Sequence, residues 1–265
     1  GKRFCAQLLL TGTQEPRKPH NAFVSLFQKQ KSSGYSMKQI RYDASVRTVD
    51  QQLAHLVTAL RAERPNLLVA VVNDHGEGLN QPFHHGRGHG NYLYQSAIGN
   101  PQIWFHPGLP DPGRRIGGLM MNIDVHPTML DLLGLASSSV VDGKSQRAAI
   151  MGETDRGAHD LAFSETMFRK SWKTTVIDGT LQLIRDHHAQ EVGEDGVQET
   201  LYALTDRDGV VDLSESMPED HARLSQALTQ WEAQMNELDA TSPDAVTVEL
   251  DGQMRAQLEA MGYLE

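Results

Sequence analysis

Several features that often reveal a protein's class are missing from this sequence. Cys5 is the only cysteine among 265 residues, so no disulfide can form within the chain. No apolar run approaches the roughly 20 residues of a transmembrane helix. The 24 Lys and Arg residues are outnumbered by 34 Asp and Glu residues, and a net charge of −10 does not suit a protein whose main partner is nucleic acid. Hydrophobic residues make up 39% of the chain, enough for one sizeable core or a core with a satellite domain.

The first half of the chain alternates between apolar runs and helical patterns. Continuous apolar runs predict buried strands at residues 4–10 and 67–72, and a third short strand is expected at 102–105. Helical spacing of apolar residues predicts helices over 43–63 and 124–133. A strand that is apolar throughout is typical of a parallel sheet covered by helices on both faces. We therefore expect an open α/β sheet in this half.

The pattern changes near residue 137. After a serine-rich, linker-like stretch, short segments with hairpin-like turns predict antiparallel strands, and an amphipathic pattern predicts a long helix at 218–238. The sequence therefore predicts two domains, an α/β core at 1–136 and a smaller α+β subdomain at 137–265. The strands are expected at 173–178, 180–185 and 200–203.

Polar residues follow the predicted strand at 67–72 directly, in the order Asn-Asp-His-Gly-Glu. In open parallel sheets, ligands bind beyond the carboxyl ends of the strands. A carboxylate and an imidazole side by side are suitable ligands for a divalent cation, so Asp74 and His75 are candidate metal ligands. An ordinary turn, with Asp74 as a cap and an exposed His75, is the structural alternative.

The loop after these residues is rich in glycine and histidine. His84, His85 and His89 lie within six positions of one another, out of 12 histidines in the chain. Surface histidines are common, so this cluster by itself favours a metal or anion site only modestly.

Taken in order, the motifs of this chain resemble those of the sulfatases. These motifs are an apolar strand ending in a Glu-Pro pair, Asp-His-Gly-Glu, a glycine loop leading into Tyr-Leu-Tyr, an apolar strand with a Pro-Gly turn, a Pro-Thr helix ending in Leu-Leu-Gly-Leu, and a Met-Gly-Tyr-Leu-Glu tail. They occupy residues 8–16, 74–77, 88–94, 101–108, 124–135 and 254–265. The resemblance spans nearly the whole chain.

This resemblance implies a partial α/β/α sandwich of the alkaline-phosphatase-like type and a metal-dependent hydrolysis of sulfuric esters. It makes Asp74 and His75 ligands of one divalent metal ion, most often Ca²⁺, with Mn²⁺ or Zn²⁺ in some members. His89 occupies the position of the catalytic Lys or His that contacts the anionic oxygens of the ester. Gln14, His89 and Arg87 are the expected substrate-binding residues. The implied partner is a small anionic ester, and many bacterial relatives are exported, which favours a periplasmic or extracellular location by analogy.

Two departures from the family pattern bear on activity. Gln14 stands where relatives have a histidine, and an amide can donate a hydrogen bond to an oxyanion but does not transfer protons as an imidazole does. The family's nucleophile motif, Cys/Ser-x-Pro-x-Arg, does not occur, because Cys5 is followed by neither the proline nor the arginine. The acidic metal-binding pair that precedes that motif in the family is also absent. We therefore expect the sequence to be a fragment without its nucleophile.

Three other interpretations remain at this stage. The same motifs suit a phosphoester or phosphonate hydrolase, or a phosphotransferase, of the same superfamily. The missing nucleophile and Gln14 suit a non-catalytic binding module or degenerate relative. The third is a generic α/β domain that carries these motifs by chance.

Overall fold

A computed structural model describes residues 4–14, 17–29, 34–79, 87–136, 141–168, 172–188, 196–206, 209–241, 251–252 and 254–255. The chain divides into two compact units. One comprises residues 1–65 together with 242–265, and the other comprises residues 66–241. The predicted division at residues 136 and 137 stays a prediction.

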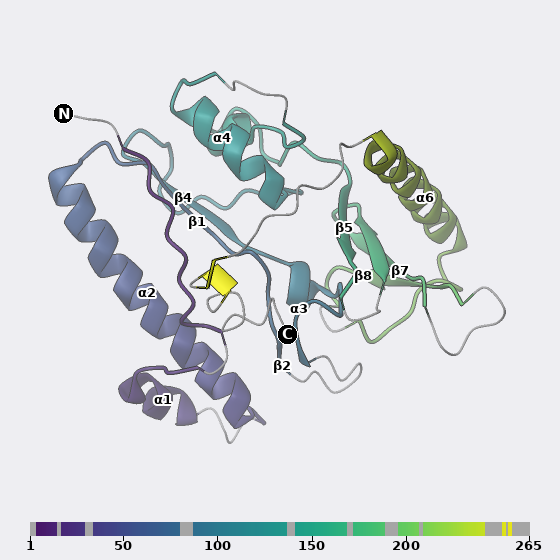
Figure 1. Ribbon diagram of the computed structural model, residues 1–265, viewed down its shortest axis with the longest axis horizontal. Helices are drawn as coiled ribbons and strands as arrows, with labels where there is room; N and C mark the ends of the chain where they lie inside the picture. Colours follow the sequence, from purple (N-terminus) through teal and green to yellow (C-terminus); the bar gives the residue numbers. More distant parts are fainter. Residues whose placement is uncertain are drawn as a thin grey trace. The chain divides into compact units, whose positions relative to one another are not determined.

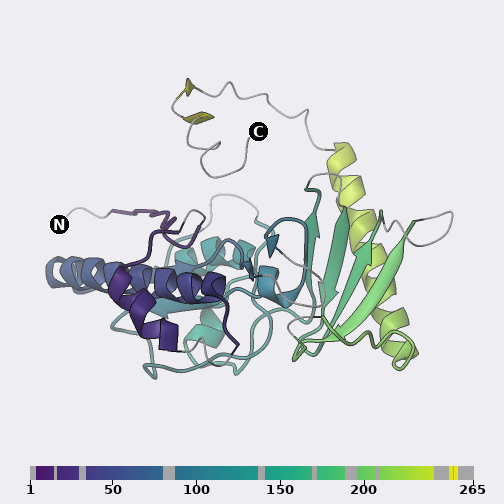
Figure 2. The ribbon, with the colours of Figure 1, turned by 90° about the horizontal axis from the view of Figure 1, so that it is seen from below.

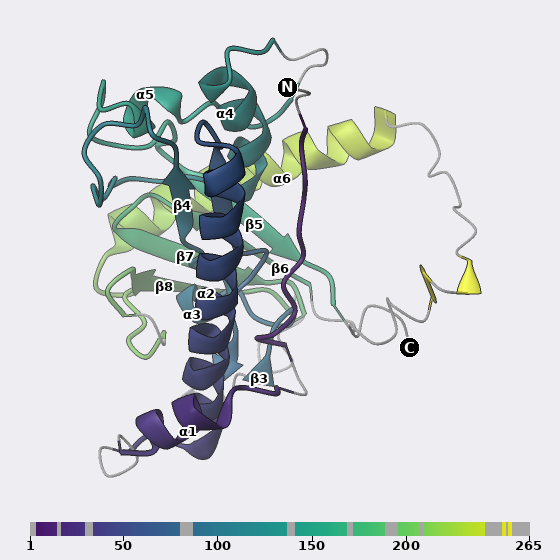
Figure 3. The ribbon, with the colours of Figure 1, turned by 90° about the vertical axis from the view of Figure 1, so that its left-hand side faces the viewer.

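The described part of the first unit includes the helices α1 (Asn21–Gln28) and α2 (Met37–Glu63). They pack against each other, with α1 beside the N-terminal half of α2 (Figure 3). The helix predicted at 43–63 is confirmed but begins six residues earlier. Ser36 explains the earlier start, because its side chain caps the Gln39 amide while the Gln39 side chain accepts from the Ser36 amide.

The strand predicted at 4–10 is wrong. This segment forms no strand in the described structure, and its side chains are exposed, with Leu8 at 60% and Leu9 at 69%. An apolar run forms a strand only where a second backbone supplies hydrogen bonds. Among the described residues, no strand pairs with this segment.

The second unit begins with β1 (Val69–Val72), which pairs antiparallel with β4 (Gln102–Phe105). Both strands were predicted, but the expected parallel sheet buried on both faces was not found at this place. Within the described residues β1 and β4 form a two-stranded sheet, and Val72 is 41% exposed. With one neighbouring strand, the apolar faces of β1 are only partly covered. Two short strands, β2 (Gly78–Leu79) and β3 (Arg87–Gly88), pair antiparallel in the following loop, and α3 (Gln95–Ile98) leads into β4 (Figure 1).

The helix predicted at 124–133 is confirmed as a short 3₁₀ turn, η2 (Asn122–Asp124), followed by α4 (Val125–Leu132). Gly134 ends it with a positive φ of 65°, and the Leu135 amide donates back to the Leu130 carbonyl at 2.8 Å. This is the glycine-terminated end that the sequence predicted. A further short helix, α5 (Arg147–Ile150), comes after it.

A four-stranded antiparallel sheet in the order β5-β6-β7-β8 completes the second unit, with α6 (Pro218–Thr241) across one of its faces (Figure 2). The three predicted strands and the predicted helix are confirmed within a few residues. The core between sheet and helix consists of aliphatic side chains, and the Phe163 ring stacks on Trp231 with centroids 5.2 Å apart. The strands are β5 (Ala162–Thr166), β6 (Lys173–Ile177), β7 (Leu181–Asp186) and β8 (Gln198–Ala203), and the core residues are Val176, Leu181, Leu183, Leu201, Leu224 and Leu228. Among the described helices, none is both long and apolar enough to cross a bilayer.

Candidate functional site

The loop that leaves β1 carries the first two predicted site residues. Asp74 lies two residues after the strand, and its side chain is 58% exposed. Asp74 Oδ1 accepts a hydrogen bond from the His75 backbone amide at 2.9 Å. The carboxylate is therefore held against its own loop while remaining accessible.

The His75 ring is oriented by the backbone of the next residue. Its Nδ1 lies 2.7 Å from the Gly76 carbonyl oxygen, which can only accept, so Nδ1 carries the proton of the neutral ring. The acceptor nitrogen is then Nε2, which lies 3.7 Å from Asp74 Oδ2. Metal–ligand distances of about 2.0–2.6 Å allow two atoms at this spacing to contact one cation. A backbone carbonyl that accepts from the second ring nitrogen is the usual support of a metal-binding histidine.

Gly76 allows this loop to approach the segment around α3 closely. Its amide donates to the Ala97 carbonyl at 2.6 Å, and the next amide, of Glu77, donates to the Ser96 carbonyl at 3.0 Å. A Cβ atom on Gly76 would lie 2.1 Å from the Ser96 oxygen. The turn therefore requires glycine for space.

His89 lies beside these residues, as the resemblance implied. Its ring stacks on His75 with centroids 3.7 Å apart, and its Nδ1 is 3.9 Å from Glu77 Oε1. Burial and the proximity of His75 lower the pKa of His89, while the charges of Glu77 and Asp74 act in the opposite direction. The neutral imidazole of His89 is therefore favoured over the cationic form near neutral pH. A neutral ring still donates one hydrogen bond.

These donors suit a metal ion only in part. Asp74 supplies a carboxylate and His75 a nitrogen, which are ligands for Ca²⁺, Mn²⁺ or Zn²⁺ to different degrees. Among the residues that the structure describes, no group of three or more His, Cys, Asp or Glu side chains is arranged to hold a metal. Asp74 and His75 would therefore form part of a coordination shell.

For the other predicted site residues, the structure describes the backbone or the local turn only. The backbone of Arg87 pairs with Leu79 in the β2–β3 ladder, but its side chain lies outside the described part, as do His84 and His85. Gln14 belongs to the first unit, where its backbone amide donates to the Thr11 carbonyl at 3.0 Å in a turn. The proposed roles of Gln14 and Arg87 remain predictions.

The sequence did not indicate the buried pair of Asp124 and His159. Asp124 is fully buried, and both of its carboxylate oxygens lie 2.9 Å from His159 Nε2. The two residues are 35 positions apart, and His159 lies in a segment with no motif, so no local pattern could have paired them. This carboxylate also accepts bonds from other buried groups, so it acts as a structural anchor.

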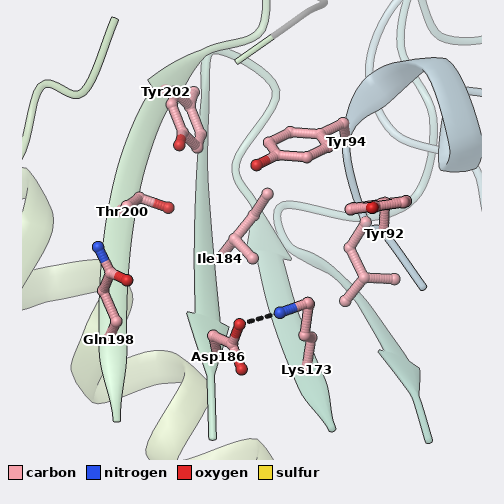
Figure 4. Close-up of a pocket in the computed structure, with 9 residues that line it drawn as sticks. Tyr92, Tyr94, Lys173, Ile184, Asp186, Gln198, Thr200 and Tyr202 are labelled. Carbon is pink, nitrogen blue, oxygen red and sulfur yellow. Dashed lines mark hydrogen bonds and ion pairs between the residues drawn. The ribbon is translucent and has the colours of Figure 1, made fainter. Parts of the chain in front are cut away.

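A pocket of about 190 Å³ opens on the face of the four-stranded sheet opposite α6 (Figure 4). The ring of Tyr94 meets that of Tyr202 nearly edge-on, with centroids 6.0 Å apart, and burial raises the pKa of Tyr94. Lys173 forms an ion pair with Asp186 in the pocket, so its positive charge is balanced. The pocket therefore offers aromatic faces and hydrogen-bonding groups rather than a net charge. It is lined by Tyr92, Leu93, Tyr94, Lys173, Ile184, Asp186, Gln198, Thr200 and Tyr202.

Part of the chain is similar to a known protein family. Residues 9–135 match the family model described as Sulfatase. The chain is 28% identical over 110 residues to the steryl-sulfatase of Rattus norvegicus, and the matched region covers 37% of this chain and 19% of that protein. It is 27% identical over 114 residues to the N-acetylglucosamine-6-O-sulfatase of Bacteroides thetaiotaomicron, covering 42% and 20% of the two chains.

Solved structures share the fold. A protein in complex with its substrate D-glucosamine-2-N,6-O-disulfate superposes with a TM-score of 0.64 at 18% identity, over 86% of this chain and 48% of that one. The phosphonate monoester hydrolase of Silicibacter pomeroyi superposes with a TM-score of 0.60 at 22% identity, over 75% and 42%. The matches thus span about a fifth of the curated relatives and less than half of these solved chains. The chain has the mixed α/β fold of the alkaline-phosphatase-like proteins, and its residues 9–135 match the sulfatase family model.

Proposed function

We propose that this chain is the C-terminal part of a metal-dependent sulfuric ester hydrolase, with a small anionic ester as its substrate. The observation that carries the proposal is the convergence of Asp74, His75 and His89 after β1, within the residues that match the sulfatase family model. The glucosamine disulfate bound by one structural neighbour supports the choice of an anionic sulfate ester.

In this proposal Asp74 and His75 hold one divalent cation, with Ca²⁺ as the first candidate and Mn²⁺ or Zn²⁺ as alternatives. A bound cation would neutralise the charge of the ester oxygens during the reaction. The carboxylate of Asp74 supplies a charged oxygen ligand. The hydrogen bond from His75 Nδ1 to the Gly76 carbonyl keeps the Nε2 lone pair directed outward from the ring for coordination.

His89 contacts the substrate in this proposal. Because its pKa is lowered, it acts as a neutral hydrogen-bond donor toward the ester oxygens rather than as a fixed positive charge. Gln14 and Arg87 are proposed as additional substrate contacts. Gln14 would donate a hydrogen bond but would not protonate the leaving group.

In this proposal the attacking group comes from outside these 265 residues. The sequence contains no Cys/Ser-x-Pro-x-Arg motif, and the chain spans less than half of the solved structures that it resembles. We therefore propose that the chain contributes one side of the metal site and that residues outside this sequence contribute the nucleophile and the remaining ligands.

A phosphonate monoester hydrolase is the second candidate. The fold is nearly as similar to such an enzyme, with a TM-score of 0.60, as to the sulfated-sugar complex. The two candidates share the metal ligands and differ in the ester that reacts, so the substrate decides between them.

The test is to isolate the protein from its source and assay it, with added Ca²⁺ or Mn²⁺, on 4-nitrophenyl sulfate and on 4-nitrophenyl phenylphosphonate. Preferential hydrolysis of the sulfate supports the proposal, and preferential hydrolysis of the phosphonate moves it to the second candidate. The DNA upstream of the Gly1 codon is read in parallel. If the isolated protein hydrolyses neither ester and no in-frame nucleophile motif precedes Gly1, the catalytic proposal is wrong and a non-catalytic relative remains.

A further inference from the structure

We propose that Asn122 is a positioning residue that holds the Asp74–His75 loop in place, and that the buried Asp124 cluster in turn fixes Asn122. The functional meaning of this clamp rests on the proposed metal-dependent function. The hydrogen bonds that Asn122 donates to this loop can be tested without a metal.

The side-chain amide of Asn122 donates hydrogen bonds to the first residues of the Asp74–His75 loop. Its Nδ2 lies 2.8 Å from the carbonyl oxygen of Asn73 and 3.4 Å from that of Asp74. Asn100 reaches the same Asp74 carbonyl from the other segment, with its Nδ2 at 3.3 Å. Two amides, from segments 22 residues apart in the sequence, therefore hold the peptide on either side of the Asp74 Cα.

Asn122 is able to act as a clamp because the turn that carries it is fixed. The carboxylate of Asp124, at the end of the same 3₁₀ turn, accepts from the backbone amides of Met121 and Lys144, each at 2.8 Å. It also accepts from the Gln146 side-chain amide at 2.7 Å and from His159 Nε2 at 2.9 Å. Asp124 is fully buried, so each of these bonds is shielded from water.

The turn is also attached to the sheet that carries the loop. The side-chain amide of Gln102, the first residue of β4, donates to the Met121 carbonyl at 3.1 Å. Since β4 pairs with β1 through Val72 and Gln102, the end of β1 and the start of the turn share one support. The path from the Asp124 anchor to the loop therefore consists of short, directional bonds.

The position of Asn122 separates this role from a role in core packing. Its side chain is exposed, in contrast to that of Asp124, so truncating it opens no buried cavity. Outer groups that orient metal ligands typically change metal affinity about 10- to 100-fold when removed. Asn122 acts through the backbone of Asp74 rather than by touching the substrate, so we assign it to positioning and not to catalysis.

The experiment compares the full 265-residue chain with Asn122→Ala, and uses Ile123→Ala, an exposed change in the same turn, as the matched control. Amide hydrogen exchange of residues 73–77 is expected to become roughly three- to tenfold faster in Asn122→Ala, as follows from the loss of one hydrogen bond. Exchange in β6 and β7 should stay as in the wild type, and Ile123→Ala should leave the loop unchanged. In parallel, calorimetry with Mn²⁺ should show about tenfold weaker binding in Asn122→Ala at an unchanged melting temperature.

The two readouts separate the two proposals. Unchanged loop exchange in Asn122→Ala, or equal acceleration in Ile123→Ala, would overturn the clamp whatever the metal data show. Faster loop exchange in Asn122→Ala, together with a wild-type chain that binds no Mn²⁺, would support the clamp and count against metal binding by this chain alone. Asp124→Asn tests the anchor, because it should accelerate exchange in the same loop; an unchanged loop in a folded Asp124→Asn variant would remove Asp124 from the proposal.

Discussion

The imidazole rings of His75 and His89 lie stacked, with centroids 3.7 Å apart and planes inclined by 24°. Fourteen positions separate the two residues in the sequence, and the antiparallel pairing of β2 with β3 brings the chain back toward the end of β1. Their chemical environments differ, since His75 bonds to the Gly76 carbonyl while His89 faces Glu77. This difference favours different roles, a metal ligand and a substrate contact.

Asp74→Ala should abolish divalent cation binding by the chain. The variant removes the one charged oxygen ligand next to His75, and an imidazole alone binds Ca²⁺ poorly. Isothermal titration with Ca²⁺ and Mn²⁺ measures the effect, and we expect an affinity loss of at least about 100-fold. Asp160→Ala, at a side chain 98% exposed, serves as the control and should bind like the wild type. Equal affinity in the Asp74 variant and the wild type would show that the ligand assignment is wrong.

His89→Ala should separate metal binding from anion binding. We expect Ca²⁺ affinity to stay within about threefold of the wild type, because His89 stacks on His75 and is not itself a proposed ligand. Binding of inorganic sulfate to the Ca²⁺-loaded chain should weaken roughly tenfold, the usual effect of losing one hydrogen bond to a charged group. A His89→Ala chain that loses Ca²⁺ binding as completely as Asp74→Ala would instead make His89 a metal ligand.

Elements whose sequence pattern lies within one short segment were predicted well. The helix at 218–238 was found because the apolar face that includes Leu224 and Leu228 repeats at helical spacing, and both residues are fully buried against the sheet. The hairpin around Gly179 was found because its turn residues are local. The strand at 4–10 was wrong because an apolar run does not specify which backbone pairs with it. The antiparallel pairing of β1 with β4 depends likewise on contacts some 30 residues apart.

The site divides in the same way. Asp74 and His75 are adjacent in the sequence, and the motif that contains them also predicts His89. Asn122 and His159 gave no signal, since an asparagine in a turn and a histidine in an irregular segment are common. Their roles arise from hydrogen bonds that span 49 and 35 positions. Sequence reasoning thus located the candidate ligands but not the groups that hold their loop.

Gly76→Ala should destabilise the protein by about 1–3 kcal/mol, because the new methyl group would lie 2.1 Å from the Ser96 carbonyl oxygen and the backbone must move. Gly117→Ala is the matched control, since its Cβ would have its nearest neighbour at 4.0 Å, and it should change stability by less than about 0.5 kcal/mol. Urea unfolding of both variants measures the difference. Similar stabilities for the two would mean that the loop adapts to a side chain at position 76.

Arg185→Met should cost about 3–5 kcal/mol, because it leaves two carboxylates buried without their main cation. Arg185 is 8% exposed and joins β7 to its neighbours through ion pairs with Glu199 and Glu232. The triple variant Arg185→Met, Glu199→Gln, Glu232→Gln removes all three charges and should recover at least half of the loss. Urea titration at neutral pH provides the comparison. A loss below about 1 kcal/mol in the single variant would indicate that nearby His187 and His221, each 3.2 Å from one of the glutamates, already compensate their charge.

Protonation of the Asp178 carboxylate should make the protein less stable in acid. Burial alone would raise the pKa of this carboxyl, but hydrogen bonds from Arg223, from the Leu181 amide and from the amide and hydroxyl of Thr180 outweigh it and lower the pKa from 3.8 to about 2. Since the folded pKa lies below the unfolded value, the stabilisation is fully present above about pH 4 and is lost as the pH falls toward 2.

Asp178→Asn tests this linkage. The variant should be about 1–2 kcal/mol less stable than the wild type at pH 7. This is less than the free energy that corresponds to the full pKa shift, because the Arg223 side chain is about half exposed and solvent screens its charge. This difference should shrink between pH 4 and pH 2, where the wild-type carboxyl takes up its proton. Urea unfolding at pH 7, 5, 3.5 and 2.5 measures it, and Asp160→Asn, at a nearly fully exposed position, should show no such pH dependence. A wild-type advantage that stays constant down to pH 2.5 would mean that Asp178 stabilises the β6–β7 turn through its shape and hydrogen bonds rather than through its charge.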